Sequence, residues 1–269
     1  MIRRETVRAD VSRAVVLDEM RENLEVMRKA ADDGIHEKQS SVTGFTGGDA
    51  IKMKRYGSRS YMGEGMCSLV ASALGVVEVN SSMGRIVAAP TAGSAGVLPA
   101  CLFAAQEKFN LTDEVLVRGL FTAAAVGMII AENATLAGSE GGCQAEVGSA
   151  SAMAAAALCE MRGALPAVSL NASGIALKMI LGLVCDPIAG LVECPCIKRN
   201  AMGAVNAMLA ADMALSGISS LVPFDEVVMA TRSVGRQMNV DLRETAKGGL
   251  AATPTGKELM RRLKSDNNS

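Results

Sequence analysis

The stretch QAEVGSASAMAAAALCEM, residues 144–161, is dominated by alanine. Alanine has the strongest intrinsic preference for the α-helix, so this stretch predicts a single helix. The whole chain has a related bias: 49 % of its residues are hydrophobic, 3 % are aromatic, and methionine occurs 17 times. Small residues let helices pack closely, and methionine fills irregular gaps between them. A β-sandwich would need more β-branched and aromatic residues. The sequence therefore predicts an all-α fold, a multi-helix body with small-residue helix packing.

Apolar residues at helical spacing predict further helices along the chain. Thr112 is a suitable N-cap, followed by Asp113 and Glu114 in a first helical turn. Asp186-Pro187 also resembles a helix start. No internal repeat or change of composition marks a linker, so we expect one domain over residues 1–269, with about the last five frayed. The expected helices cover residues 5–31 (closed by Gly34), 62–79, a segment ending at Phe109, 112–136, 144–161, 169–184, a segment opened by Asp186-Pro187, and 197–215.

Charge and hydropathy exclude several classes of protein. The formal net charge is −1, and lysine and arginine are dispersed, which argues against a nucleic-acid partner. The apolar run 119–131 is bounded by charged residues and is too short to cross a bilayer, so we expect no membrane span. The first residues have no apolar core typical of a signal peptide. We therefore expect a cytoplasmic protein whose seven cysteines are reduced.

Three cysteines stand where helices are expected to begin: Cys143, Cys185 and Cys196. The N-terminus of a helix lowers the pKa of a thiol and favours the thiolate, so three such ends suit an anionic or metallic centre. Cys159 lies sixteen residues after Cys143 on the expected helix, about 24 Å away at helical rise, and is excluded from that centre. Spacing alone does not separate Cys194 from Cys196. Cys67 and Cys101 lie in small-residue helical stretches and are expected in the core.

Zinc is a poor fit to these thiols. The chain has no paired Cys-x-x-Cys motif, and its one histidine, His36, lies among charged residues typical of a surface. An iron–sulfur cluster held by three thiolates, with one open iron, remains as the interpretation.

Five motifs in order resemble the alpha chain, or catalytic domain, of the iron–sulfur-dependent L-serine dehydratases. They are TGFTGGDAIKM (43–53), MGRIVAAPTAGSAGVLP (83–99), GGCQAEVGSASAMAAAA (141–157), GLVCDPIAGLVECPCIKRNAMGA (182–204) and GGLAATPTG (248–256). The resemblance implies a 4Fe–4S cluster on Cys143, Cys185 and Cys196, with Cys194 as a bystander. It implies deamination of L-serine to pyruvate and ammonia without pyridoxal phosphate. The length of 269 residues fits the two-component form, with a separate beta chain and an oligomeric enzyme.

Two glycine-rich loops are candidates for binding the substrate, because such turns can form anion-binding nests of backbone N–H groups. The residues concerned are Thr46, Gly47, Gly48, Thr91 and Ser94. The base that removes the α-proton stays open, and another chain is one possible source. The titratable candidates within this chain are Asp49, Lys52, Glu146, Lys198 and His36.

Three alternatives differ from the dehydratase interpretation. A related iron–sulfur L-cysteine desulfidase would eliminate sulfide by similar chemistry. A non-catalytic iron–sulfur redox or iron sensor would need an output module such as a basic DNA-binding helix pair, which the sequence does not show. A purely structural helical partner would leave the three thiols at helix starts unexplained.

Overall fold

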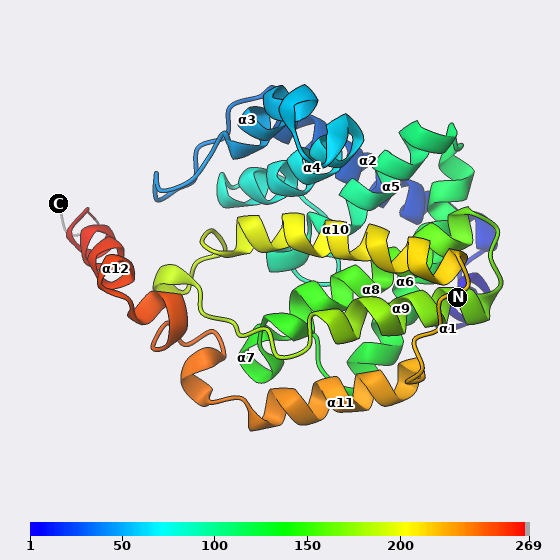
Figure 1. Ribbon diagram of the computed structural model, residues 1–269. Helices are drawn as coiled ribbons and strands as arrows, with labels where there is room; N and C mark the ends of the chain where they lie inside the picture. The colour runs from blue at the N-terminus through cyan, green and yellow to red at the C-terminus, as the bar shows by residue number, and fades with distance from the viewer. Residues whose placement is uncertain (267–269) are drawn as a thin grey trace.

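The computed structural model describes residues 1–266, which fold into twelve α-helices joined by short loops and single helical turns (Figure 1). No β-strand occurs in this part of the chain, and an isolated parallel bridge joins Cys185 to Arg243. The all-α prediction is confirmed. The helices are α1 (Ile2–Ala9), α2 (Arg13–His36), α3 (Asp49–Tyr56), α4 (Gly63–Ser81), α5 (Val97–Phe109), α6 (Asp113–Asn133), α7 (Gly138–Gly141), α8 (Ser149–Met161), α9 (Pro166–Met179), α10 (Cys196–Leu215), α11 (Phe224–Gln237) and α12 (Pro254–Asp266).

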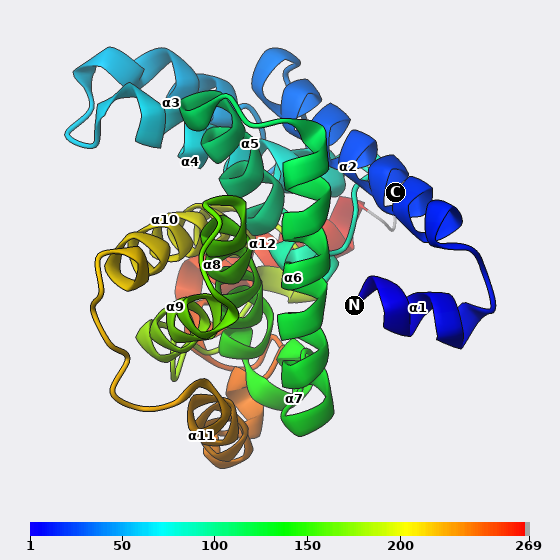
Figure 2. The ribbon, with the colours of Figure 1, turned by 90° about the vertical axis from the view of Figure 1, so that its right-hand side faces the viewer.

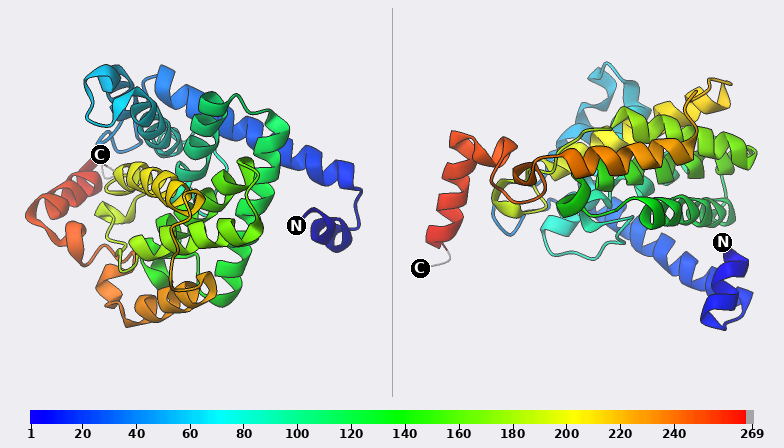
Figure 3. Two further views of the ribbon diagram at one scale, coloured as in Figure 1. Left: turned by 45° about the vertical axis from the view of Figure 1, so that its right-hand side comes forward. Right: turned by 90° about the horizontal axis from the view of Figure 1, so that it is seen from below.

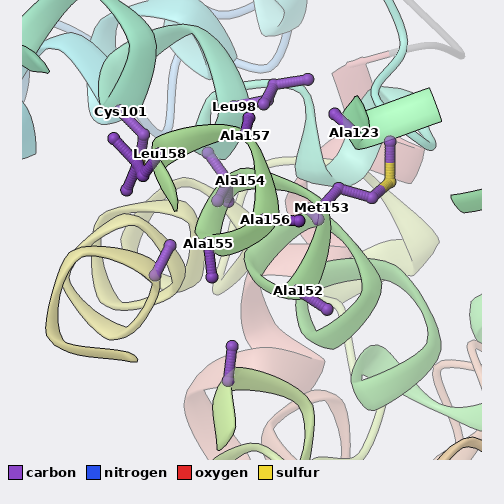
Figure 4. Close-up of a cluster of buried hydrophobic side chains, with 14 of the residues drawn as sticks. Leu98, Cys101, Ala123, Ala152, Met153, Ala154, Ala155, Ala156, Ala157 and Leu158 are labelled. Carbon is purple, nitrogen blue, oxygen red and sulfur yellow. The ribbon is translucent and has the colours of Figure 1, made fainter. Parts of the chain in front are cut away.

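The alanine-rich helix α8 is the centre of the core. It packs against α5, α6, α9 and α10, and every residue in it except Glu160 is buried. Figure 4 shows its run Ala152–Leu158 surrounded by side chains from neighbouring helices, among them Leu98, Cys101 and Ala123. A helix enclosed on all sides needs small side chains so that four neighbours can approach its backbone at once. This explains the composition of the stretch.

A second close approach joins α2 to α4. A Cβ atom added to Gly75 of α4 would lie 2.9 Å from the Cα atom of Gly34 on α2. The two helices therefore cross at a point where only glycine fits on either side.

Several expected helix boundaries were wrong. The helix expected over residues 5–31 is two helices, because Asp10 takes a left-handed conformation (φ 52°) and Ser12 caps α2 through the N–H of Val15. The helix α9 begins at Pro166, three residues before its expected start, because the N–H that proline lacks has no partner within the helix at this first position. The helix α9 then ends at Met179, five residues before its expected end.

Two further expectations need correction around the cysteines. Residues 144–148 form a π-helical turn before α8 begins at Ser149. Asp186-Pro187 precedes only the single 3-10 turn Ile188–Gly190, because the Asp186 carboxylate bonds instead to Arg199 and to the N–H of Leu250. The short helix α3 and the late helices α11 and α12 were not expected. Of the last five residues, which were expected to fray, 265 and 266 belong to α12, and 267–269 lie outside the described residues.

Several loops lie together at one end of the helix bundle. In Figure 1, α2 to α5 lie above α8, α9 and α10, and α11 lies below them. Figure 2 shows α1 at the edge of the body, where Ile2 packs against the core, and the right-hand view of Figure 3 shows α12 projecting from the body. The helix α6, longer than the apolar run 119–131 within it, is long and apolar enough to span a membrane by length and composition alone, a test that the core helix of a soluble protein also passes. Half of the most apolar 18-residue segment of α6 is buried in this structure.

Candidate active site

The starts of the α8 segment and of α10, together with the loop after α9, lie at the same end of the bundle (Figure 1). Each brings one of the three predicted thiols. Cys143 follows Gly142, whose φ of 75° turns the chain into the π-helical turn. Cys185 lies in an extended segment that bonds to Leu242 and Glu244 through its own N–H and carbonyl. Cys196 is the first residue of α10.

These three thiols are buried and lie close enough to affect one another electrostatically. Burial raises the pKa of Cys143 to about 11 and that of Cys196 to about 12, and it also raises the pKa of Cys185. For Cys185 and Cys196, the neighbouring thiols contribute further to the increase in pKa. The expectation that these pKa values are lowered was therefore wrong for the free thiols, because burial raises them more than the backbone N–H groups and Arg199 lower those of Cys143 and Cys196.

Arg199 is the positive charge beside the thiols, and the sequence analysis did not single it out. Its guanidinium donates to the carbonyl of Val184 and to the Asp186 carboxylate, both at 2.8 Å. The ion pair with Asp186 is largely buried. Arg199 also lowers the pKa of Cys143, opposing the effect of burial. In the sequence, Arg199 follows Cys196 by three residues, and this spacing could have identified it as a neighbour of the thiol on the same helical face.

The remaining cysteines have other surroundings. Cys67, Cys101 and Cys159 are buried at 0–1 % exposure, and the expectation that Cys67 and Cys101 lie in the core is confirmed. The thiol of Cys159 contacts the carbonyl of Ala211 near the C-terminal end of α8, whereas Cys143 precedes the start of that helix. Cys194 is only half-buried, and its carbonyl accepts a hydrogen bond from Ile188.

Glu146 is the one candidate base that lies beside the thiols. Its carboxylate accepts a hydrogen bond of 2.8 Å from the Thr91 hydroxyl and lies 3.8 Å from the sulfur of Cys185. Burial raises the pKa of this carboxyl, and the Thr91 hydroxyl opposes that shift. A Cβ atom added to Gly138 would lie 2.8 Å from Glu146 Oε2 and 3.0 Å from Cys185 Sγ, so glycine is required for this close packing.

The other four candidate bases are engaged at the surface. Asp49 forms ion pairs with Lys52 at 2.9 Å and with Lys198 at 2.7 Å, and these partners hold the pKa of Asp49 below its usual range. His36 is exposed at the end of α2, where it pairs with Asp32 at 2.9 Å.

The two candidate substrate loops differ in what they contact. Thr91 begins a 3-10 turn, Ala92–Ser94, and bonds to both Glu146 and Ser94. Ser94 is fully buried, so its side chain supports the loop from inside. The structure thus brings this loop to the carboxylate beside the thiols, while the Ser94 hydroxyl is already engaged within the protein.

The loop with Thr46, Gly47 and Gly48 is held by two buried carboxylates that the sequence analysis missed. The Thr46 hydroxyl donates to Glu193 at 2.9 Å, and Thr43 donates to the same carboxylate. Glu78 accepts the N–H of Asp49 at 2.7 Å and so caps α3. Gly47 and Gly48 both have positive φ, at 137° and 75°. Their proposed nest therefore lies beside Glu193, whereas Thr91 lies beside Glu146.

The donor set at the bundle end suits an iron–sulfur cluster better than a single ion. Among residues 1–266, no three His, Cys, Asp or Glu side chains are arranged to hold one metal ion. Cysteine thiolates are the usual ligands of iron–sulfur clusters. Three buried thiols from three separate segments, with an arginine beside them, fit such a group.

Comparison with known proteins places the chain in a family. Residues 1–251 match the family described as Serine dehydratase alpha chain. The chain is 53 % identical over 265 residues to the probable L-serine dehydratase, alpha chain, of Bacillus subtilis (98 % of this chain, 88 % of the relative). It is 49 % identical over 242 residues to the L-serine dehydratase, alpha chain, of Peptoniphilus asaccharolyticus (88 % and 82 %). Over 182 residues it is 47 % identical to L-serine dehydratase 2 of Escherichia coli (66 % and 40 %).

The helical fold and the gathered thiols and carboxylate thus occur in an enzyme of the dehydratase class. The chain belongs to the serine dehydratase alpha chain family.

Proposed function

We propose that this chain is the catalytic alpha chain of an enzyme that converts L-serine to pyruvate and ammonia with a 4Fe–4S cluster. The observation that carries the proposal is the meeting of Cys143, Cys185 and Cys196 with Glu146 at one end of the bundle. The names of the relatives supply the substrate. Pyridoxal phosphate has no part in the proposed reaction.

In this proposal Cys143, Cys185 and Cys196 hold the cluster as thiolates. The bound cluster supplies a Lewis-acidic iron that assists departure of the serine hydroxyl. Arg199 offsets part of the negative charge of the thiolates, and its bond to Asp186 fixes its direction. Burial of the three sulfurs limits access of water and oxidants to them.

Elimination from serine removes the α-proton to a base and the β-hydroxyl as water. The resulting aminoacrylate tautomerises and hydrolyses to pyruvate and ammonia. We propose that Glu146 is the residue of this chain that carries a proton during these steps, at Oε2, the oxygen that faces Cys185. Its position supports this role, since Asp49, Lys52, Lys198 and His36 are engaged elsewhere.

The loop 91–96 is the proposed site for the substrate carboxylate. Thr91 contacts Glu146 directly, so a substrate held by the N–H groups of this loop would lie next to the proton-carrying group. The loop around Thr46, Gly47 and Gly48 is proposed to line the opposite side, where Glu193 holds it close to the Cys194–Cys196 segment.

The designation of the relatives as alpha chains supports a separate beta chain as partner, within an oligomeric enzyme. The seven cysteines are all free thiols, which supports a reducing compartment, and we propose the cytoplasm.

The test is pyruvate formation from L-serine after anaerobic reconstitution with iron and sulfide, with and without the beta chain. The proposal expects pyruvate only from iron-loaded protein. A loaded cluster that forms no pyruvate, even with the beta chain present, would refute the serine reaction. Preferential release of sulfide from L-cysteine would indicate the desulfidase instead, and inactivity on both substrates would favour a sensor.

A further inference from the structure

Asn200 has a fully buried side chain near the start of α10, four residues after Cys196. Its amide nitrogen donates to the carbonyl of Gly93 at 2.7 Å and to the carbonyl of Cys196 at 2.9 Å. Its amide oxygen accepts the N–H of Gly96 at 2.9 Å. Both amide hydrogens and the carbonyl oxygen are therefore used, and all three bonds involve main-chain atoms.

These bonds connect two segments that the proposed function uses for different tasks. Gly93 and Gly96 belong to the proposed substrate loop, and Cys196 is a proposed cluster ligand. Asn200 bonds to Gly93 and Gly96 within this loop. Thr91, at the start of the loop, donates to Glu146. The loop is thus anchored once to the proton-carrying carboxylate and once to the start of α10.

The main chain of the loop is closely packed at Gly96, which leaves little space for another conformation of the loop. A Cβ atom on Gly96 would lie 3.1 Å from the Asn200 amide oxygen and would overlap the carbonyl of Ala73. The main chain of the loop therefore touches both α4 and Asn200 without an intervening side chain. A shorter or reoriented residue at position 200 would leave buried carbonyl and N–H groups without partners, at a cost in free energy that moving the loop would relieve.

We infer that Asn200 is a positioning residue, which holds the substrate loop 91–96 in a fixed position relative to Cys196 and hence to the cluster. The inference rests on the proposed function for the identity of the substrate. The contacts themselves stand without it. The hydrogen bonds of the Asn200 side chain all go to main-chain atoms, so it acts through the loop.

The same helix offers a matched control. Asn206 is also buried, and its amide donates to the Ser151 hydroxyl at 2.7 Å and to the carbonyl of Ala176 at 2.9 Å. It lies six residues along α10, about 9 Å further from the site at helical rise. Asn200→Ala and Asn206→Ala therefore remove the same side chain and a similar number of buried hydrogen bonds, but only the first releases the loop.

The experiment uses the reconstituted enzyme with its beta chain and measures iron content, kcat and KM for L-serine, and amide hydrogen exchange. Asn200→Ala is expected to retain iron, because the three thiols are untouched. Its kcat/KM should fall roughly 100-fold, the order of effect of a misplaced binding group. Most of that loss should appear in KM, since the loop contacts substrate in the ground and transition states alike. Exchange should rise across residues 91–96. Asn206→Ala should lose similar thermal stability with kcat/KM and exchange at 91–96 unchanged.

Equal kinetic losses in the two variants, or unchanged exchange at 91–96 in Asn200→Ala, would overturn the inference. If Asn200→Ala fails to fold, Asn200→Asp provides the test, because it keeps an acceptor for Gly96 and loses both donors. It should show the same rise in KM and in loop exchange. Should the wild-type enzyme form no pyruvate, the proposed function fails, and the exchange comparison alone then supports or overturns the positioning role.

Discussion

Cys194 and Cys196 are two positions apart in the same loop, yet their surroundings differ in the folded chain. Cys196 is buried at the start of α10, and this burial, with smaller contributions from Cys143 and Glu146, raises its pKa. Cys194 is half-buried, and its carbonyl bonds to the 3-10 turn at Ile188. The difference arises from neighbours that are distant in sequence, and it leads to a prediction for each thiol.

Cys143→Ala, Cys185→Ala and Cys196→Ala should each abolish cluster binding and activity, because each removes one of three proposed thiolate ligands. Cys194→Ala should keep both. Iron and sulfide content after anaerobic reconstitution, together with pyruvate formation, measures the outcome. Loss of iron in Cys194→Ala alone would contradict the ligand assignment.

Glu146→Gln should retain the cluster and lose activity by about 10²–10⁴-fold, the usual contribution of a positioned proton-transfer group. The amide keeps an acceptor for Thr91 but cannot take up a proton at Oε2. Glu140→Gln is the control, since Glu140 is exposed on the same segment and bonds to Thr135. Full activity in Glu146→Gln would remove this residue from the proposed mechanism.

Among the elements, those whose limits depend on local composition were predicted well. Residues 62–79, the segment ending at Phe109, and 197–215 match α4, α5 and α10 closely. The boundaries that failed depend on tertiary contacts. Asp186 bonds to Arg199 and Leu250 instead of capping a helix, and the turn at Gln144 becomes π-helical where Gln144 bonds to Gly182 and Thr231.

The crossing of α2 and α4 gives a prediction for the stability of these elements. Gly75→Ala should lower the free energy of unfolding by about 1–3 kcal/mol, because the new methyl group meets the backbone at Gly34 and the helices must separate. Denaturant unfolding measures the change.

Gly65→Ala on the same helix is the matched control for that substitution. A Cβ atom there meets open space, and alanine favours the helix over glycine by about 1 kcal/mol, so this variant should be as stable as the wild type or more so. Equal stabilities for the two variants would contradict the close crossing.

For the whole molecule, the proposed cluster joins segments that are far apart in sequence. Cys143 precedes α8, Cys185 lies in the loop after α9, and Asp186 next to it holds the C-terminal segment at Leu250. A group bound only by the folded chain stabilises it. Loss of the cluster should therefore make the contacts between these segments less stable.

Cluster loading should raise the Tm, by about 2–4 °C for each kcal/mol of stabilisation in a protein near this size. The same iron and sulfide treatment should leave the Tm of Cys143→Ala unchanged. Exposure to air should return the loaded protein to the lower Tm and inactivate it, since a cluster with one open iron is expected to degrade on oxidation. An aerobic preparation with full activity and unchanged Tm would contradict the cluster.

The sequence by itself determined the helical class, because alanine-rich and amphipathic periodicity is a local property of the chain. It also singled out Cys143, Cys185, Cys196 and Glu146 as candidates, through the positions of the cysteines at expected helix starts and through motifs that resemble the family. It left five possible bases, and only the folded chain placed Glu146 beside the thiols, with the other four in surface ion pairs. The raised thiol pKa values and the contacts of Arg199, Glu193 and Asn200 were likewise decided by tertiary structure. Burial and long-range hydrogen bonds depend on which segments meet in space, and a residue's neighbours in sequence do not specify them.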